Sequence, residues 1–209
     1  MEVNSLGETP DEWRAAYSEA VRWFVQVGDA ATEHLEWPGL GVWSVHELIG
    51  HISRALSTVD SYVDSSSQAA VAIPTAVAYF EQVVQGVDHS AVADRARQAA
   101  EALGDEPMAG VRALADRVVP WVGGLGDPRC ATPFGVMLLS EYLPSRTFEL
   151  VVHTCDLAAA IDHPADIPEG AGRSALRLAA GLAAHRSPSD VLRALTGRTT
   201  LPVGYTVLS

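Results

Sequence analysis

The segment SEYLPSRTFELVVHTCDLAAAI, residues 140–161, decides the fold class. At about 100° per residue its apolar side chains cover nearly the whole circumference of a helix, which predicts a largely buried α-helix. Pro144 is compatible with such a helix only in its first turn. Ionisable groups on a buried helix need partners, yet four of them follow spacings of three, four and three and line one narrow spine: Arg146, Glu149, His153 and Asp156.

Two interpretations of this spine remain open. The first is a solvated helix edge with an Arg146–Glu149 pair, worth about 0.2–0.5 kcal/mol. The second is a metal site, because Glu149 and His153 lie one turn apart and can present an oxygen and an imidazole nitrogen to one ion, about 2 Å from each. The apolar remainder of the helix favours the metal site.

A third metal ligand has to come from another helix, and His51 is the best candidate among the seven histidines. It lies at the margin of the apolar stripe of its predicted helix, next to Leu48 and Ala55. A hydrogen-bonded structural histidine is the alternative. No convincing fourth protein ligand is found, which is typical of an open, catalytic zinc site.

A second motif, His46-Glu47-x-x-x-His51, does not fit the zincin signature. That signature needs histidines four residues apart, whereas residues five apart point about 140° away from each other on a helix. Glu47 beside His51 would suggest a dinuclear centre, but carboxylate di-iron bundles use Glu-x-x-His. Glu47 is also expected to cap its helix.

Capping and break signals predict the other elements. Three capping boxes begin at Thr9, Ser44 and Ser187. No repeat or composition shift marks a second domain, so residues 1–209 are expected to form a single metal-binding domain: an all-α, antiparallel four-helix bundle with additional short helices and a short C-terminal extended strap. The helices are expected at about 10–35, 44–63, 75–103 with an interruption near 86–90, 107–122, 140–161, 166–186 and 188–196, and the strap at 198–209.

Composition excludes several classes of partner. The chain has 48% apolar residues and a net charge of −12, which disfavours nucleic acid and anionic membranes. Cys130 and Cys155 form no CxxC pair and do not suggest a disulfide framework, and neither is expected to act as a nucleophile. No signal peptide and no membrane span is expected, so we predict a cytoplasmic protein.

Two segments, WSVHELIGH at 43–51 and YLPSRTFELVVHTCDL at 142–157, resemble the mycothiol-dependent maleylpyruvate isomerase family. This family belongs to the DinB-like superfamily of metal-binding four-helix bundles, found largely in actinobacteria. The segments ALTGR at 194–198 and LPVGY at 201–205 also resemble the end of that family's sequences. The resemblance therefore covers most of the chain.

The resemblance implies a His–Glu–His metal triad at His51, Glu149 and His153, holding a divalent ion, most simply zinc. It implies that the open coordination position receives a low-molecular-weight thiol such as mycothiol, activated as the thiolate. Arg146 and Asp156 would then orient Glu149 or His153.

The resemblance implies a mycothiol-dependent S-transferase or isomerase. Its expected partners are a small thiol and an electrophilic substrate. Whether the protein is a monomer or a homodimer stays open. The isomerase also has a C-terminal domain that helps to form its substrate site, and no carboxylate-binding clamp can be identified in this sequence. Two other functions stay open: a non-enzymatic metal-binding or regulatory module, and a metal-dependent hydrolase that uses a bound water.

Overall fold

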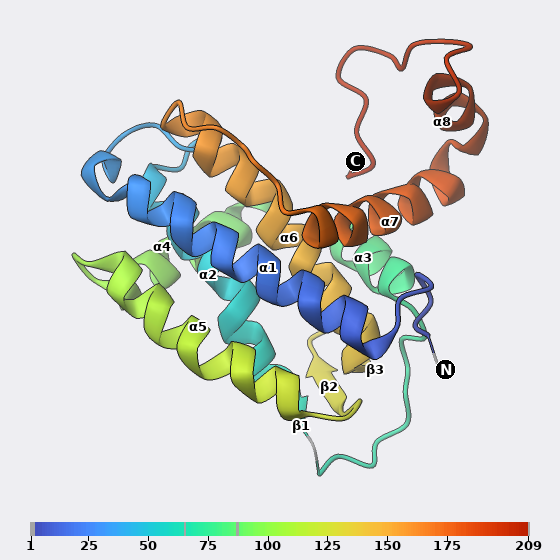
Figure 1. Ribbon diagram of the computed structural model, residues 1–209, viewed down its shortest axis with the longest axis horizontal. Coiled ribbons are helices and arrows are strands. Elements are labelled where there is room, and N and C mark those ends of the chain that lie inside the picture. Colours follow the sequence, from blue (N-terminus) through green and yellow to red (C-terminus); the bar gives the residue numbers. More distant parts are fainter. Residues whose placement is uncertain (1–2, 65, 87, 209) are drawn as a thin grey trace.

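A computed structural model describes residues 3–64, 66–86 and 88–208, and the protein is predominantly helical, as predicted (Figure 1). A small antiparallel sheet is added to the helices. In chain order the elements are α1 (Pro10–Ala30), the 3-10 turn η1 (Thr32–His34), α2 (Val45–Tyr62), β1 (Val63–Asp64), α3 (Ala76–Gln85), α4 (His89–Leu103), α5 (Pro107–Gly124), β2 (Arg129–Thr132), β3 (Gly135–Leu138), α6 (Leu139–Ala160), α7 (Glu169–Arg186) and α8 (Pro188–Leu195).

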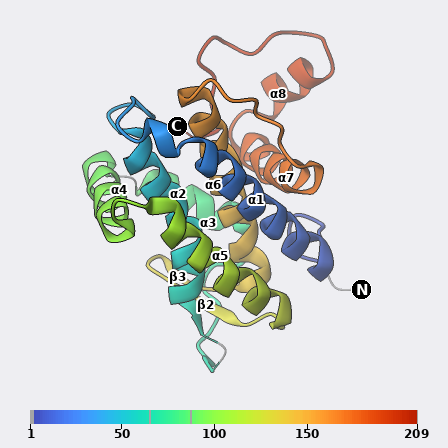
Figure 2. The same ribbon diagram turned by 60° about the vertical axis from the view of Figure 1, so that its left-hand side comes forward.

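Helices α1, α2, α5 and α6 form the predicted bundle. Helix α6 packs against α1 and α2, and α5 packs against the same two helices. The bundle is antiparallel because α1 and α6 run one way while α2 and α5 run the other (Figures 1 and 2). The Arg14 guanidinium, near the start of α1, accordingly donates to the carbonyl of Leu125 at the end of α5, at 2.7 Å. Helix α4 covers α2, and α7 lies across α1 and α6.

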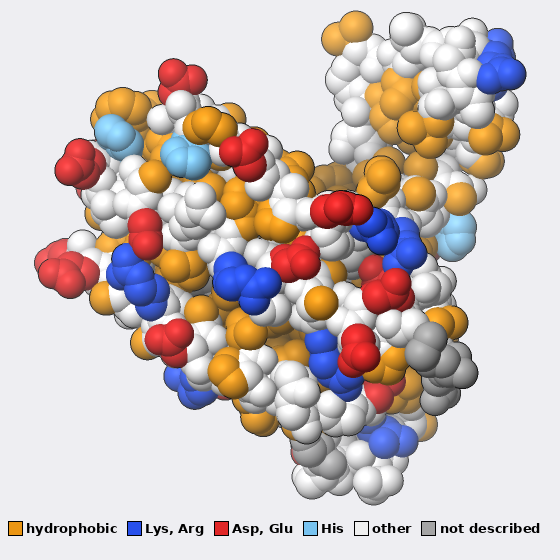
Figure 3. Space-filling view, viewed as in Figure 1, with side chains coloured by type: hydrophobic (Ala, Val, Ile, Leu, Met, Phe, Trp, Pro, Cys, Tyr) orange, Lys and Arg blue, Asp and Glu red, His pale blue; other side chains and the backbone are white. Residues whose placement is uncertain are grey.

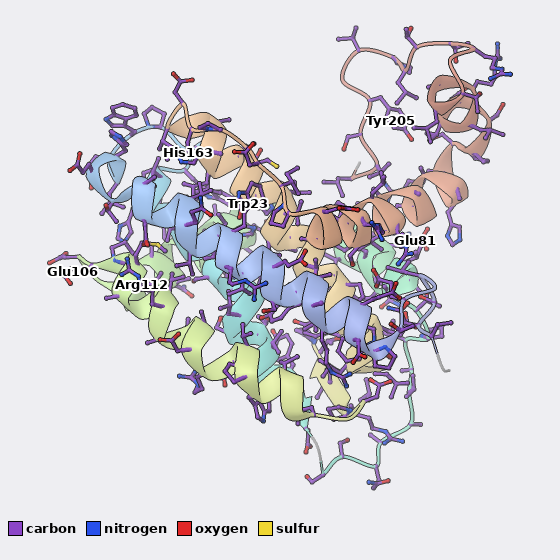
Figure 4. All side chains as sticks on the ribbon, in the orientation of Figure 1. Trp23, Glu81, Glu106, Arg112, His163 and Tyr205 are labelled. Carbon is purple, nitrogen blue, oxygen red and sulfur yellow. The ribbon has the colours of Figure 1, made fainter. Side chains whose placement is uncertain are left out.

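Two of the three predicted capping boxes are formed, and the third is not. The side chains of Thr9 and Ser44 accept hydrogen bonds from the backbone N–H groups of Glu12 and Glu47. The carboxylates of these glutamates accept from the backbone N–H groups of Thr9 and Ser44 in turn. Ser187 makes no such bond at the start of α8, so that prediction was wrong. Its hydroxyl instead hydrogen-bonds the hydroxyl of Tyr205, at 2.6 Å, and ties the tail back to α7 and α8 (Figure 4).

The helix expected over 75–103 is divided, as its predicted interruption indicated. Asp88 caps α4 by accepting from the backbone of Ser90 and Ala91, so the chain can change direction between α3 and α4. The hairpin of β2 and β3 was not predicted. In it Cys130 pairs with Met137, while β1 adds to the outer side of β2. This sheet joins the end of α2 to the start of α6.

Pro144 does not lie in the first turn of its helix, contrary to the prediction. Helix α6 begins at Leu139, which places Pro144 in its interior. Proline has no backbone N–H, so the carbonyl of Ser140 loses its helical donor. The side-chain amide of Asn4 donates to this carbonyl at 3.1 Å and supplies the missing hydrogen bond.

The C-terminal segment extends away from the bundle (Figures 1 and 2). Helix α8 packs on α7 and has no buried residue, and the described tail after Arg198 consists of turns, bends and irregular chain without a strand. Ser209 lies outside the described residues. Apolar side chains gather on the surface of this segment, including Leu192, Leu195 and Val203 (Figure 3).

Gly50 allows α2 and α4 to approach closely, which yields a first testable prediction. A Cβ atom at Gly50 would lie 2.5 Å from the backbone nitrogen of Ala100 and 2.8 Å from the carbonyl oxygen of Ala96. Because both atoms belong to backbone, the helices would have to separate. We predict that Gly50→Ala lowers the free energy of unfolding by about 1–3 kcal/mol in urea denaturation.

The matched control for this change is Gly123→Ala near the end of α5, where no atom lies within 4 Å of the added Cβ. There alanine is expected to raise the free energy of unfolding by up to about 1 kcal/mol, because glycine is costly in a helix. Equal effects of the two substitutions would contradict the close packing of α2 on α4.

Candidate metal centre

Helices α2 and α6 bring His51 to the predicted pair Glu149 and His153. Glu149 and His153 lie one turn apart on α6, and His51 approaches them from α2. Trp43, just before α2, packs against the His51 ring with the ring centroids 4.7 Å apart. The rings of His51 and His153 meet edge to face, also at 4.7 Å. All three predicted residues are therefore in one cluster.

The three side chains converge on one carboxylate oxygen. Glu149 Oε2 lies 3.7 Å from His51 Nε2 and 3.5 Å from His153 Nε2. These separations are longer than a good N–H···O hydrogen bond. Within the described ranges no other group of three His, Cys, Asp or Glu side chains comes together in this way.

The separations match those expected between ligands of one ion. Two atoms, each about 2.0–2.1 Å from a tetrahedral zinc ion, are about 3.3–3.4 Å apart. Two imidazole nitrogens and a carboxylate oxygen are also donors that zinc accepts. The residues therefore fit a divalent cation both in spacing and in chemistry.

Asp156 is positioned to orient the imidazole ring of His153 by a hydrogen bond. His153 Nδ1 contacts Asp156 Oδ2 at 2.9 Å, one turn further along α6. With its Nδ1–H donated to this carboxylate, the His153 ring presents its Nε2 towards Glu149. Histidine ligands of metals are usually oriented by a carboxylate in this manner.

The electrostatics of the cluster require a positive charge beside Glu149. Burial alone would raise the pKa of Glu149, but its polar contacts with His153 and His51 hold that pKa well below the usual range. Burial also opposes protonation of His153, but Asp156 and Glu149 outweigh it and raise the pKa of His153 to about 9. Burial lowers the pKa of His51. A bound cation would take the place of the His153 proton.

The cluster is accessible from a cavity. The side chains of His51, Glu149 and His153 are 14%, 22% and 18% exposed, so they are neither on the open surface nor sealed in the core. His51 and Glu149 line a cavity of about 310 Å³, whose wall also includes Arg146 and Tyr142. A small molecule entering this cavity would reach His51 and Glu149.

The other predicted candidates lie elsewhere or have other partners. Glu47 caps α2 and pairs with Arg97 at 3.3 Å, which agrees with the rejection of a dinuclear centre. Cys130 is buried, and burial raises the pKa of its thiol to about 12. Burial also raises the pKa of the Cys155 thiol. Both cysteines are therefore expected to stay as neutral thiols.

Two arginines of the cavity wall were not predicted from the sequence. Arg54 and Arg95 line the cavity together with Arg146, although only Arg146 was singled out. One signal was available for Arg54, which follows His51 by three residues and therefore shares its helix face. No comparable signal existed for Arg95, because it belongs to α4, a different helix.

The family model for the mycothiol maleylpyruvate isomerase N-terminal domain matches residues 13–158, which include every member of the cluster. No curated protein and no solved structure matches the chain. No described helix is long and apolar enough to cross a membrane. The match spans more than half of the chain, so the protein belongs to the mycothiol maleylpyruvate isomerase N-terminal domain family, within the DinB-like superfamily.

Proposed function

We propose that this protein is a metal-dependent enzyme of the thiol S-transferase or isomerase type. In this proposal His51, Glu149 and His153 hold a divalent ion, most simply zinc, and a mycothiol-like thiol binds beside them. The observation that carries the proposal is the convergence of three ligand atoms: Glu149 Oε2 lies 3.7 Å from His51 Nε2 and 3.5 Å from His153 Nε2, and His51 and Glu149 line an accessible cavity. The family membership supplies the thiol.

Each residue of the cluster has a distinct task in this proposal. A bound divalent cation lowers the pKa of a coordinated thiol, so that thiolate is available at neutral pH. Asp156 holds the His153 ring through Nδ1, and Glu149 supplies the negative charge that balances the cation. The contacts with His153 and His51, with a smaller contribution from the positive charge of Arg146, lower the pKa of Glu149 and keep this carboxylate ionised. In the proposed reaction the thiolate sulfur would add to an electrophilic carbon of a double bond held in the cavity, and the electron pair released from that double bond would take up the proton that the thiol had lost.

An enzyme is favoured over a regulatory module because the cluster provides three ligands and not four. Structural zinc sites are closed by four protein ligands, whereas catalytic sites keep a position open. Among the described His, Cys, Asp and Glu side chains, none joins the three as a fourth. Both described cysteines are free, which supports a reducing, cytoplasmic location for the proposed reaction.

The extent of the domain is also a proposal. We propose that residues 1–209 act as one folding unit, because α7 contributes Ala171, Leu178 and Leu182 to the same apolar core as the bundle helices. Helix α7 is thus expected to unfold together with the bundle.

The metal content of purified protein tests the proposed ligands. Wild-type protein is expected to hold about one divalent ion per chain by elemental analysis. Glu149→Ala and His153→Ala are each expected to retain less than a tenth of it, since each removes one of three ligands. His163→Ala, in the segment after α6 (Figure 4), is the control and should keep the wild-type content. Equal metal content in all variants would contradict the assignment.

Cobalt substitution tests the thiol. Adding mycothiol, or N-acetylcysteine as a smaller thiol, to the Co²⁺-loaded protein is expected to produce a sulfur-to-cobalt charge-transfer band in the near ultraviolet. N-acetylserine, which has oxygen in place of sulfur, should produce none. An unchanged spectrum at saturating thiol would refute thiol activation, and turnover of an ester or amide without any thiol would favour the hydrolase.

A further inference from the structure

The two histidines of the metal centre are held in different ways. His153 Nδ1 hydrogen-bonds Asp156 Oδ2, at 2.9 Å. The same nitrogen of His51 is buried and has no hydrogen-bond partner in the part of the chain that the structure describes. A histidine ligand usually has a hydrogen bond at its second nitrogen, which fixes the direction of the ring. Another kind of contact must therefore orient the His51 imidazole.

Two aromatic contacts take the place of that hydrogen bond. The indole of Trp43 packs against the His51 ring with the centroids 4.7 Å apart and the two planes tilted by 32°. The His153 ring contacts the His51 ring at the same centroid distance, but edge to face, at 85°. Tilted stacking and edge-to-face contact at this distance both stabilise aromatic pairs. Together the two contacts restrict the rotation of the His51 imidazole, which a single contact would leave freer.

Trp43 is itself fixed by a tight turn just before α2. Its backbone N–H donates to the carbonyl of Leu40 at 3.0 Å, and its own carbonyl accepts from the N–H of Gly39 at 2.7 Å. A Cβ atom at Gly39 would lie 2.7 Å from the carbonyl oxygen of Ser44, so a larger residue there would push the turn apart. Ser44 then caps α2, the helix that carries His51. The turn and the helix start therefore hold the indole and the imidazole in a fixed relation.

We infer that Trp43 is a positioning residue of the metal centre: its indole holds the His51 imidazole in the orientation that directs Nε2 to the ion. It does for His51 what the Asp156 carboxylate does for His153. The inference rests on the metal site of the proposed function and adds to it a residue that is not a ligand. It also gives a task to the turn at residues 38–44, which closes a Pro38–Ser44 bridge and has no other contact with the three ligands among the described residues than this indole.

Metal affinity tests this role, measured as competition for Zn²⁺ between the protein and a chromophoric chelator. Trp43→Leu keeps an apolar side chain but removes the flat ring, and it is expected to weaken Zn²⁺ binding at least about tenfold. Trp43→Phe keeps a ring that can stack, so its affinity is expected to stay within about threefold of the wild type. Asp156→Asn removes the charge that supports the other histidine, and it should weaken binding about 10- to 100-fold.

Trp37→Leu is the matched control. Trp37 stacks on His34 with the centroids 4.0 Å apart and the planes tilted by 36°, a contact of the same kind in the same connection between α1 and α2. Neither residue belongs to the metal cluster, so this variant is expected to keep the wild-type affinity for Zn²⁺. Gly39→Ala displaces the indole of Trp43 without removing it. It should also weaken Zn²⁺ binding, and it keeps the test valid if Trp43→Leu does not fold.

A second readout separates positioning from a general loss of stability and needs no metal. In the metal-free protein the ring protons of His51 lie against the indole, whose ring current shifts their NMR signals. Trp43→Leu is expected to move these signals towards the values of a free histidine, whereas Trp37→Leu should leave them in place. A variant that only lost stability would keep the His51 signals of its folded form unchanged.

Three results would overturn the inference: wild-type Zn²⁺ affinity in Trp43→Leu, equal weakening by Trp37→Leu and Trp43→Leu, or equal weakening by Trp43→Phe and Trp43→Leu. The last result would mean that the flat ring has no part in the effect. Failure of the proposed function looks different. A wild-type protein that binds one Zn²⁺ but no thiol would contradict the proposed enzyme, and the dependence of Zn²⁺ affinity on Trp43 would remain.

Discussion

The proposed metal centre depends on the contact of one carboxylate, that of Glu149, with two imidazoles from different helices. A carboxylate at the inner wall of a cavity needs compensating positive charge, and the low pKa of Glu149 reflects that need. The carboxylates of Asp156 and Glu149 in turn raise the pKa of His153, because they stabilise its protonated, positively charged form. Because His51 belongs to α2 and the other two residues to α6, the contact joins these two helices at the site. The site therefore depends on the packing of α2 against α6.

The connections of the bundle place a second charged group beside this contact. The long crossover between α2 and α5 contains α4, which packs on α2 next to Gly50 and carries Arg95 to the cavity that His51 lines. The small sheet holds the end of α2 near the start of α6. A negatively charged chain thereby acquires a cavity whose wall contains the carboxylate of Glu149 and three arginines.

Local periodicity was sufficient to predict much of this structure. Glu149 and His153 follow helical spacing, and two capping boxes mark the starts of α1 and α2, so the all-α bundle and the pair on α6 could be predicted from neighbouring residues. The position of His51 at the edge of an apolar stripe indicated the third member. Features that depend on distant contacts could not be predicted. Pro144 lies inside α6 because Asn4, 136 residues from Ser140 in the chain, replaces the missing donor. Arg95 reaches the cavity only through the packing of α4.

X-ray absorption at the edge of the bound metal would test whether His51, Glu149 and His153 hold the ion. With these three ligands we expect a first shell of light atoms at about 2.0–2.1 Å, with the multiple-scattering pattern of two imidazoles, and a sulfur at about 2.3 Å only after a thiol is added. A sulfur shell in the thiol-free protein, or a spectrum without imidazole scattering, would contradict it. Either result would mean that the ion is held by residues other than His51, Glu149 and His153.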